Sequence, residues 1–322
     1  MEQSISTRAN RAIKEKVFPG CVVGWIKDGK KKVLPFGNFT YEIDSKKVDK
    51  DSIYDVASIT KVIPTSCLLL DLVHKGQISL EDQVAKYVSG FRKPEVIIKH
   101  LLSYTLNLEI SSMTSLAQKP VQEIIDTVIK APLREKPGVN YLYTNSTAAL
   151  MGFIVSKVTG KKLPDLAEER FFNPLGMRRS TFEPLKKFSK EEVVPTEVSD
   201  WRGGLLQGEV HDESTYILQK NGYYLGAAGL FSTVPDLLIF SEMIFKNTHF
   251  LELGWQSNEP KFMGEYVSEI KCKTGFTGCI LMINLKKNSV LVILSNRVYP
   301  KRPEDKEAIN RLRTEIANII FE

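Results

Sequence analysis

Hydrophobic positions follow two different spacings along this chain. Runs with strand-like apolar content lie near both ends, whereas apolar residues at helical spacing dominate the middle. The predicted strands are 21–26, 32–36, 230–232, 270–276, 279–285 and 290–294. The predicted helices are 3–16, 58–75, 93–103, 120–130, 144–159, 164–172, 235–246 and a closing helix with apolar positions from Ile309 to Ile320.

The order of these elements predicts an α+β fold in which both termini contribute strands to one antiparallel β-sheet. Helices flank this sheet, and a mainly helical domain is inserted between its two halves. We place the α/β sheet domain at 1–57 and 226–322 and the helical domain at 58–225, with the active site between them. Residues 185–225 lack clear periodicity and are expected to be irregular.

Composition excludes several classes of function. The 322 residues carry a formal charge of +6, and the basic side chains are scattered. Without a basic stripe or an aromatic stacking surface, we expect no nucleic-acid partner. The four cysteines have neither metal-ligand spacing nor the density of a disulfide framework, so we expect no metal site.

The N-terminal sequence bears on location. The first 16 residues lack an apolar signal core, and no apolar run reaches 18 residues. We therefore expect a cytoplasmic protein with no membrane partner; a signal peptide removed before residue 1 would change that expectation to a secreted or periplasmic protein. The sequence carries no signal for an oligomeric state.

The segment Ser58-Ile59-Thr60-Lys61 holds candidate catalytic groups. Residues i and i+3 are neighbours on a helix, so the Lys61 amine can reach the Ser58 hydroxyl. A serine becomes a nucleophile when a base takes its proton, and a lysine can be that base if burial or nearby cations lower its pKa. A second Ser-x-x-Lys, at 268–271, precedes a strand-like segment. The extended run 53–57 before Ser58 instead predicts a strand-to-helix turn, which would expose the hydroxyl beside free N–H groups.

Two further motifs each occur once. Tyr143-Thr144-Asn145 alone also fits a loop tyrosine before a capped helix, and Lys273-Thr274-Gly275 alone also fits an edge strand that ends in a turn. Together with Ser58-x-x-Lys61, they match the three-motif signature of class A β-lactamases and penicillin-binding proteins, with Tyr-x-Asn in place of Ser-Asp-Asn. With that replacement, the chain resembles the class C β-lactamase and penicillin-binding-protein-like serine hydrolases, which include family VIII esterases and D-alanyl-D-alanine peptidases.

The resemblance extends over most of the chain, from about residue 18 to 278. Segments that look like family landmarks are 18–20, 57–61, 76–82, 100–105, 172–177, 208–213 and 226–233. One departure is 104–108, Tyr-Thr-Leu-Asn-Leu, which follows Leu-Leu-Ser where the family often has His-Thr-Ser-Gly-Leu. The cleft near that turn is therefore expected to differ.

The resemblance implies catalytic roles for Ser58, Lys61 and Tyr143. Ser58 would attack a carbonyl carbon and form an acyl-enzyme, with Lys61 as its base, either neutral or sharing a proton with Tyr143. Lys273 nearby would lower the pKa of both groups. Tyr143 would pass a proton to the leaving group and activate the deacylating water. The backbone N–H groups of Ser58 and Phe276 would form the oxyanion hole.

Substrate binding is implied for the other motif residues. Asn145 would orient Lys61 and the substrate, Lys273 and Thr274 would bind a substrate carboxylate, and Gly275 would let the substrate approach the strand closely. The resemblance requires no metal and no organic cofactor.

His211 begins a His-x-Glu triplet, which is half of the zinc deaminase pattern. The Pro-Cys-x-x-Cys half is absent, so we reject a deaminase site. A histidine-based triad is not expected either, because no Gly-x-Ser-x-Gly elbow is present and Ser58 already has a lysine. We expect His211 to line the mouth of the substrate cleft or to fix a loop there.

The leading hypothesis is a serine hydrolase that acts on small esters as a carboxylesterase. The near alternative is a β-lactamase or a D-alanyl-D-alanine carboxypeptidase. The alternative of another class is a non-catalytic sensor that binds β-lactams or peptides, is acylated at Ser58 and barely turns over. The partner in each case is a small-molecule ester, lactam or peptide.

Overall fold

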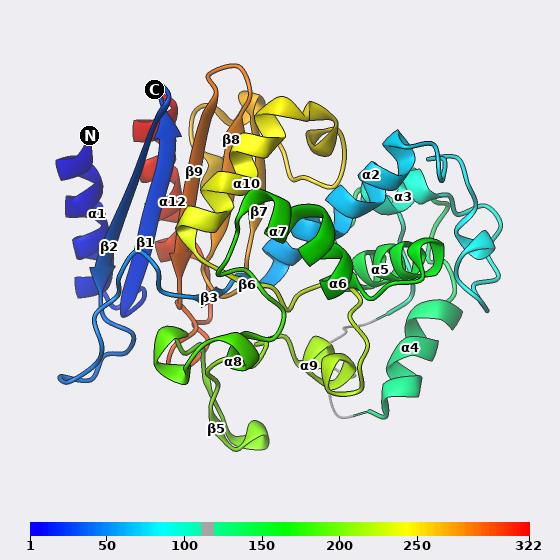
Figure 1. The fold of residues 1–322 in the computed structure, drawn as a ribbon, viewed down its shortest axis with the longest axis horizontal. Coiled ribbons are helices and arrows are strands. Elements are labelled where there is room, and N and C mark those ends of the chain that lie inside the picture. Colours follow the sequence, from blue (N-terminus) through cyan, green and yellow to red (C-terminus); the bar gives the residue numbers. More distant parts are fainter. Residues whose placement is uncertain (111–118) are drawn as a thin grey trace.

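The computed structural model describes residues 1–110 and 119–322. Its centre is a 5-stranded sheet in the order β2-β1-β9-β8-β7, so the first two strands of the chain lie beside the last three (Figure 1). All neighbouring strands in it are antiparallel. The strands are β1 (Gly20–Lys27), β2 (Lys30–Gly37), β7 (Ile270–Thr274), β8 (Ile280–Asn284) and β9 (Ser289–Ser295). The predicted α+β fold with a sheet built from both termini is confirmed.

The sheet is buried on both faces because its side chains alternate between two hydrophobic cores. In β1, Val23 and Trp25 face a core shared with α1 (Glu2–Lys14), α11 (Pro260–Met263) and α12 (Glu307–Phe321). Val22 and Ile26 face the opposite, larger core. There, α10 (Val234–Lys246) packs on β1 and β9 (Figure 1).

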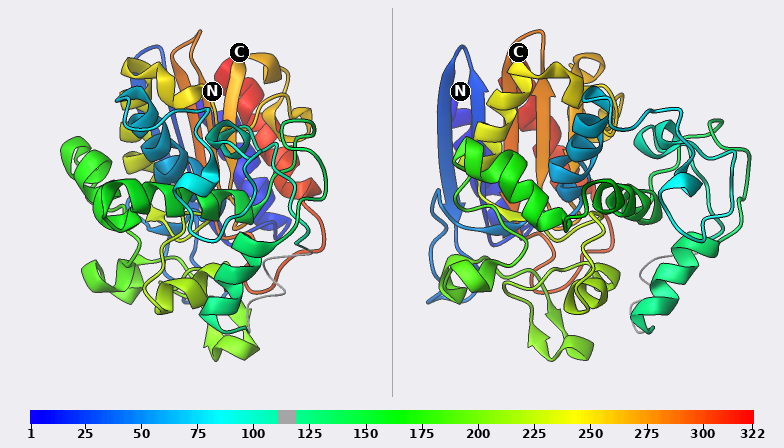
Figure 2. Two further views of the ribbon diagram at one scale, coloured as in Figure 1. Left: turned by 90° about the vertical axis from the view of Figure 1, so that its right-hand side faces the viewer. Right: turned by 45° about the vertical axis from the view of Figure 1, so that its right-hand side comes forward.

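The helical part lies beside the sheet. In the sequence it extends from β3 (Tyr54–Asp55) to β6 (Phe231–Ser232), and these two short strands pair with each other. Its helices are α2 (Cys67–His74), α3 (Ile98–Leu102), α4 (Val121–Lys130), α5 (Asn145–Thr159), α6 (Leu163–Ala167), α7 (Asn173–Leu175), α8 (Pro184–Lys187) and α9 (Glu213–Lys220). A hairpin of β4 (Val198–Ser199) and β5 (Gly204–Leu205) projects, like α4, at the end opposite the chain termini (Figure 2). The boundaries of the two proposed domains remain predictions.

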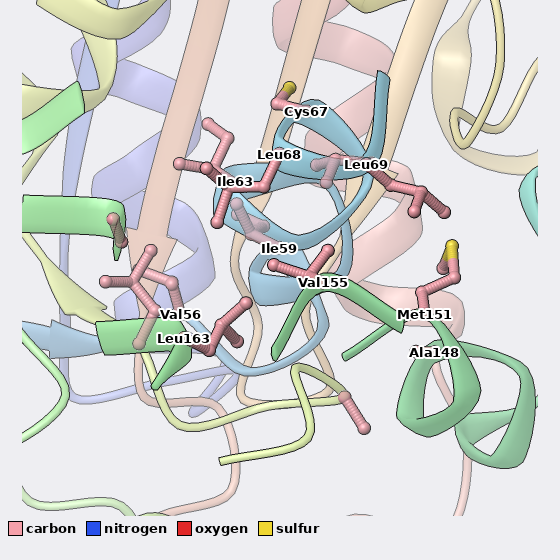
Figure 3. Close-up of a cluster of buried hydrophobic side chains, with 14 of the residues drawn as sticks. Val56, Ile59, Ile63, Cys67, Leu68, Leu69, Ala148, Met151, Val155 and Leu163 are labelled. Atoms are coloured by element: carbon pink, nitrogen blue, oxygen red, sulfur yellow. The ribbon is translucent and has the colours of Figure 1, made fainter. Parts of the chain in front are cut away.

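The segment that carries Ser58 is broken into short turns where one helix, 58–75, was predicted. A 3-10 turn (Ala57–Lys61) is followed by a wider turn (Val62–Ser66) and then α2. Ile63 is non-helical, because the residue before a proline is pushed out of the helical region. The side chains of this segment pack against α5 and Leu163 (Figure 3). The stretch Ala57–His74 is apolar and long enough to span a membrane, but 78% of it is buried in the protein, as is typical of a core helix.

Two other predictions of secondary structure were wrong in detail. Only Ile98–Leu102 of 93–103 is helical, because Ile97 is extended and pairs with Gln83 in an isolated β-bridge. The segment 185–225, predicted as irregular, contains α9. Asp212 caps this helix by accepting a hydrogen bond from the Thr215 amide at 2.9 Å.

Candidate active site

Ser58 and Lys61 lie together at the turn that follows β3. Lys61 Nζ is 2.8 Å from Ser58 Oγ and donates to the Ala227 carbonyl at 2.6 Å. Its side chain is completely buried, and burial lowers the pKa of the amine to about 7, although the nearby Asp212 carboxylate raises it. An amine with this pKa is partly neutral at neutral pH and can take the serine proton.

A strained backbone presents Ser58 to the solvent side of this turn. Ala57 has φ +48°, which is uncommon for a residue other than glycine. The buried Asp55 carboxylate accepts a hydrogen bond from the Ala57 amide at 2.8 Å and another from the His211 amide at 2.7 Å. Asp55 therefore joins the turn of Ser58 to the loop before α9. Sequence reasoning missed it, since only the structure brings residues 156 positions apart together.

Lys273 is enclosed by two tyrosine rings. Its Nζ lies 4.2 Å from the centroid of the Tyr143 ring and 4.6 Å from that of Tyr104, and its side chain is 0% exposed. Burial, and then the charge of Lys61, lower the pKa of Lys273 well below its ordinary value. We call the two buried amines, Lys61 and Lys273, the catalytic floor.

Both amines of the catalytic floor lie close to the ring of Tyr143. Lys61 Nζ is 5.3 Å from the centroid of its ring. Burial raises the pKa of the Tyr143 phenol, so the group stays protonated at neutral pH. The expectation that this pKa would be lowered was wrong, because burial of the hydroxyl raises it. A protonated phenol is a proton donor, and Lys61 is then the better base.

Asn145 is held by a carboxylate that none of the three motifs contains. Its Nδ2 donates to Asp212 Oδ2 at 3.1 Å, and within the described residues it makes no hydrogen bond to Lys61. Asp212 lies 67 residues away in sequence, at the start of the unpredicted α9. The local signal for it was a helix cap, Asp212 followed by the acidic Glu213.

A cavity of about 220 Å³ opens above Ser58. Its lining residues are Ala57, Ser58, Tyr143, Asn145, His211, Asp212, Glu213, Ala228, Phe276 and Arg302. Thr274, by contrast, donates from its amide and its hydroxyl to Gln256 Oε1, both at 3.2 Å. A Cβ on Gly275 would lie 2.5 Å from the Val56 carbonyl oxygen, so the fold itself requires glycine there. Neither these two residues nor Lys273 line this cavity, and their proposed contacts with substrate remain predictions.

One side of the cavity is a network of hydrogen-bonded and ion-paired side chains, which we call the cavity wall. Its members are Glu197, His211, Glu213 and Arg302. His211 Nε2 lies 2.5 Å from Glu197 Oε2, and Arg302 Nε donates to the same carboxylate at 2.8 Å. Arg302 also pairs with Glu213. The Phe276 ring stacks near His211, with centroids 5.7 Å apart, and closes this side.

Two backbone amides are free to bind an oxyanion. Within the described residues, neither the Ser58 nor the Phe276 N–H donates to another protein group. The first turn of a helix leaves its amides without partners, and such amides stabilise developing negative charge. Among residues 1–110 and 119–322, no group of three or more His, Cys, Asp or Glu side chains has an arrangement suited to a metal ion.

Comparison with known proteins agrees with this geometry. The profile of the Beta-lactamase family matches residues 8–315. The chain belongs to the beta-lactamase family. This family member is 26% identical to a putative D-alanyl-D-alanine carboxypeptidase of Escherichia coli (strain K12), over 79% of this chain and 71% of that protein.

Solved structures of the beta-lactamase fold superpose on nearly the whole chain. A beta-lactamase/D-alanine carboxypeptidase from Pseudomonas syringae has a TM-score of 0.78 at 16% identity and covers 98% of both chains. EstCE1, a hydrolase with promiscuous acyltransferase activity, has a TM-score of 0.77 at 16% identity and covers 100% of this chain and 98% of its own. The protein is thus a serine hydrolase of the beta-lactamase family.

Proposed function

We propose that this beta-lactamase-family member is a carboxylesterase that hydrolyses small, uncharged esters through an acyl-enzyme on Ser58. The proposal rests on one observation: among the lining residues, no unpaired cation faces the cavity. Arg302 is bound by two carboxylates of the cavity wall, and Lys273 is 0% exposed behind its tyrosine rings.

This charge arrangement favours esters over the alternatives. β-Lactams and D-alanyl-D-alanine peptides carry a carboxylate, which needs a cationic or hydrogen-bonding partner when it leaves water. An uncharged ester has no such requirement. The cavity of about 220 Å³ is also smaller than the roughly 300–1,000 Å³ of sites for drug-sized ligands. A short acyl chain against Phe276 and Ala228 fits this space.

The proposed reaction uses Lys61 of the catalytic floor together with Tyr143. Ser58 Oγ attacks the ester carbonyl carbon while its proton passes to neutral Lys61 Nζ, and the oxyanion accepts hydrogen bonds from the Ser58 and Phe276 amides. The tetrahedral intermediate collapses by breaking the C–O bond, and the alkoxide leaves with a proton from Lys61 through Tyr143. Water then attacks the acyl-enzyme, gives its proton to the same base, and releases the carboxylic acid and Ser58.

The test compares three substrates on the wild-type protein and on two variants. The proteins are wild type, Ser58→Ala and a matched control, Ser268→Ala, which alters the second Ser-x-x-Lys. Each is given p-nitrophenyl acetate, a chromogenic cephalosporin and a diacetylated Lys-D-Ala-D-Ala tripeptide. We expect rapid ester turnover in wild type and Ser268→Ala and none above background in Ser58→Ala. Equal ester turnover in Ser58→Ala would contradict the assignment of the nucleophile.

Two further outcomes would replace the esterase proposal. Faster turnover of the tripeptide or the cephalosporin than of the ester would favour a carboxypeptidase or a β-lactamase, the activities named for its relatives. An adduct on Ser58 that persists in intact-mass spectra without turnover would favour the sensor. Cytoplasmic location stays a prediction.

A further inference from the structure

A second cavity, of about 500 Å³, contains a buried arginine without a partner. Arg297 lines this cavity and is only 4% exposed. Among the residues that the structure describes, its guanidinium makes no hydrogen bond or ion pair, and its Nε is fully buried. An arginine stays protonated in proteins, and a buried charge without a partner is costly. The structure therefore holds an uncompensated positive charge that faces an open space.

The other charged residues of the lining, two lysines and two carboxylates, form no ion pair with Arg297 within the described chain. Lys16 and Lys301 line the cavity together with the carboxylates Glu15 and Asp305. Glu15 is already paired with Arg311 at 2.5 Å. Asp305 accepts a hydrogen bond from the Glu307 amide at 2.8 Å and makes no ion pair with Arg297 within the described chain. Its carboxylate raises the pKa of Arg297, but burial lowers that pKa more.

The start of α12 also faces this cavity. Ala308 and Ile309, in the first turn of this 15-residue helix, belong to the lining. The amides of a first helical turn have no partner within the helix and attract anions. The Glu307 amide is bound by Asp305, whereas within the described residues the Ala308 and Ile309 amides make no hydrogen bond. The rings of Tyr41 and Tyr299, with centroids 6.1 Å apart, form two flat walls of the same space. A planar guanidinium, free helix amides and flat walls suit an oxyanion joined to a flat or apolar group.

We propose that this cavity is a binding site for a small oxyanion, a carboxylate or a phosphate, held by Arg297 and the N-terminus of α12. It is separate from the catalytic cavity. The two cavities share no lining residue, and Phe276 lines only the catalytic one. Arg297 lies 5.4 Å and Arg302 of the cavity wall 5.7 Å from the centroid of the Phe276 ring. The site does not depend on the proposed esterase activity.

The test is thermal unfolding at constant pH and ionic strength, with chloride replaced stepwise by inorganic phosphate or by benzoate. Phosphate stabilises most proteins through exclusion from their surface, so the measured quantity is the difference between variants. We expect at least one of the two anions to raise the Tm of wild type by about 2–4 °C more than that of Arg297→Gln. The control Arg178→Gln, which alters an exposed arginine, should respond like wild type. The anion that gives the larger difference identifies the source as phosphate or carboxylate.

A second signature separates a binding site from a structural arginine. In chloride alone, Arg297→Gln should unfold at the same or a higher temperature than wild type, because it removes an uncompensated buried charge. Titration calorimetry of the anion identified above should give one site in wild type and none in the variant. A lower Tm for the variant with an unchanged anion response, or no calorimetric binding of either anion to wild type, would overturn the proposal.

Discussion

The catalytic floor and the cavity wall deal with buried charge in opposite ways. In the wall, Arg302 and His211 each have a carboxylate partner within 3 Å. In the floor, Lys61 and Lys273 have no carboxylate within ion-pair distance among the described residues; their neighbours are a hydroxyl, a carbonyl and aromatic rings. The half-buried Arg302 guanidinium keeps its charge beside its carboxylate partners, whereas burial lowers the pKa of the unpaired amines.

This difference teaches which side of the cavity can move protons. The pKa of Lys61 is lowered to about 7, where the amine exchanges protons at working pH. The Glu197 carboxylate, by contrast, keeps its charge at neutral pH. Burial raises its pKa, but hydrogen bonds from His211 and Arg302 outweigh burial and hold that pKa below the ordinary value. The floor is therefore the reactive side, and the wall is the side with fixed charges.

The largest effect should follow from Lys61→Met, which removes the base but keeps an unbranched side chain in the core. We expect kcat/KM for p-nitrophenyl acetate to fall about 10²- to 10⁴-fold, the usual contribution of general base catalysis. The control is Lys271→Met, which alters the lysine of the second Ser-x-x-Lys and should stay close to wild type. Wild-type rates in Lys61→Met would mean that Ser58 has another base.

A smaller loss should follow from Lys273→Met. The Lys273 side chain fills the space between the rings of Tyr104 and Tyr143, so its loss lets the Tyr143 phenol shift. We expect kcat to fall about 10- to 100-fold for neutral and carboxylate-bearing esters alike, the cost of slight misplacement of a reacting group. Steady-state kinetics on such a pair of esters measures this. An increase in KM confined to the carboxylate-bearing ester would instead support the carboxylate-binding role expected from sequence.

The pH dependence gives a third test, through the Asp212 carboxylate. Only neutral Lys61 can accept the serine proton, so kcat/KM of wild type should rise with pH through about 7. The negative charge of Asp212 favours protonated Lys61. Asp212→Asn removes this charge but keeps a residue that caps α9 well. We expect the rising limb to move to lower pH by up to about one unit, which is up to tenfold in rate on that limb.

The control for this shift is Asp200→Asn, which alters an exposed acidic residue in the β4–β5 turn and whose profile should match wild type. A limb that stays in place in Asp212→Asn, with unchanged thermal stability, would show that Asp212 acts only as a helix cap. A limb that moves to higher pH would contradict the sign of its effect on Lys61.

The sequence predicted the local part of this molecule better than its long-range part. Apolar runs and a tight turn predicted the strands β1, β2 and β9. The spacing of apolar residues predicted the helices α5, α10 and α12. Ser58 and Lys61 are three residues apart, so helix geometry alone brings them together. Such signals depend on residues that are close in the chain.

The missing parts depend on residues that are far apart in the chain. Asp55 binds the His211 amide, and Asp212 binds Asn145, across 156 and 67 residues. No periodicity reports such contacts. The enclosure of Lys273 and the raised pKa of the Tyr143 phenol also escape prediction, because both result from burial in the folded protein and not from a motif.

The smallest effect should come from the cavity wall, with Glu197→Gln. The amide can still accept a hydrogen bond from His211 or Arg302, but it loses the charge-assisted part of both. We expect the free energy of unfolding to fall by about 1–2 kcal/mol at pH 7, with kcat/KM within about threefold of wild type. Because the folded-state pKa of Glu197 is lowered, the advantage of wild type is present above the ordinary carboxyl pKa and is lost as pH falls below about 4. Urea unfolding of both proteins at pH 7 and at a series of pH values below about 4 measures this difference. A large loss of kcat with stability unchanged would place the wall among the reactive groups and remove the distinction from the catalytic floor.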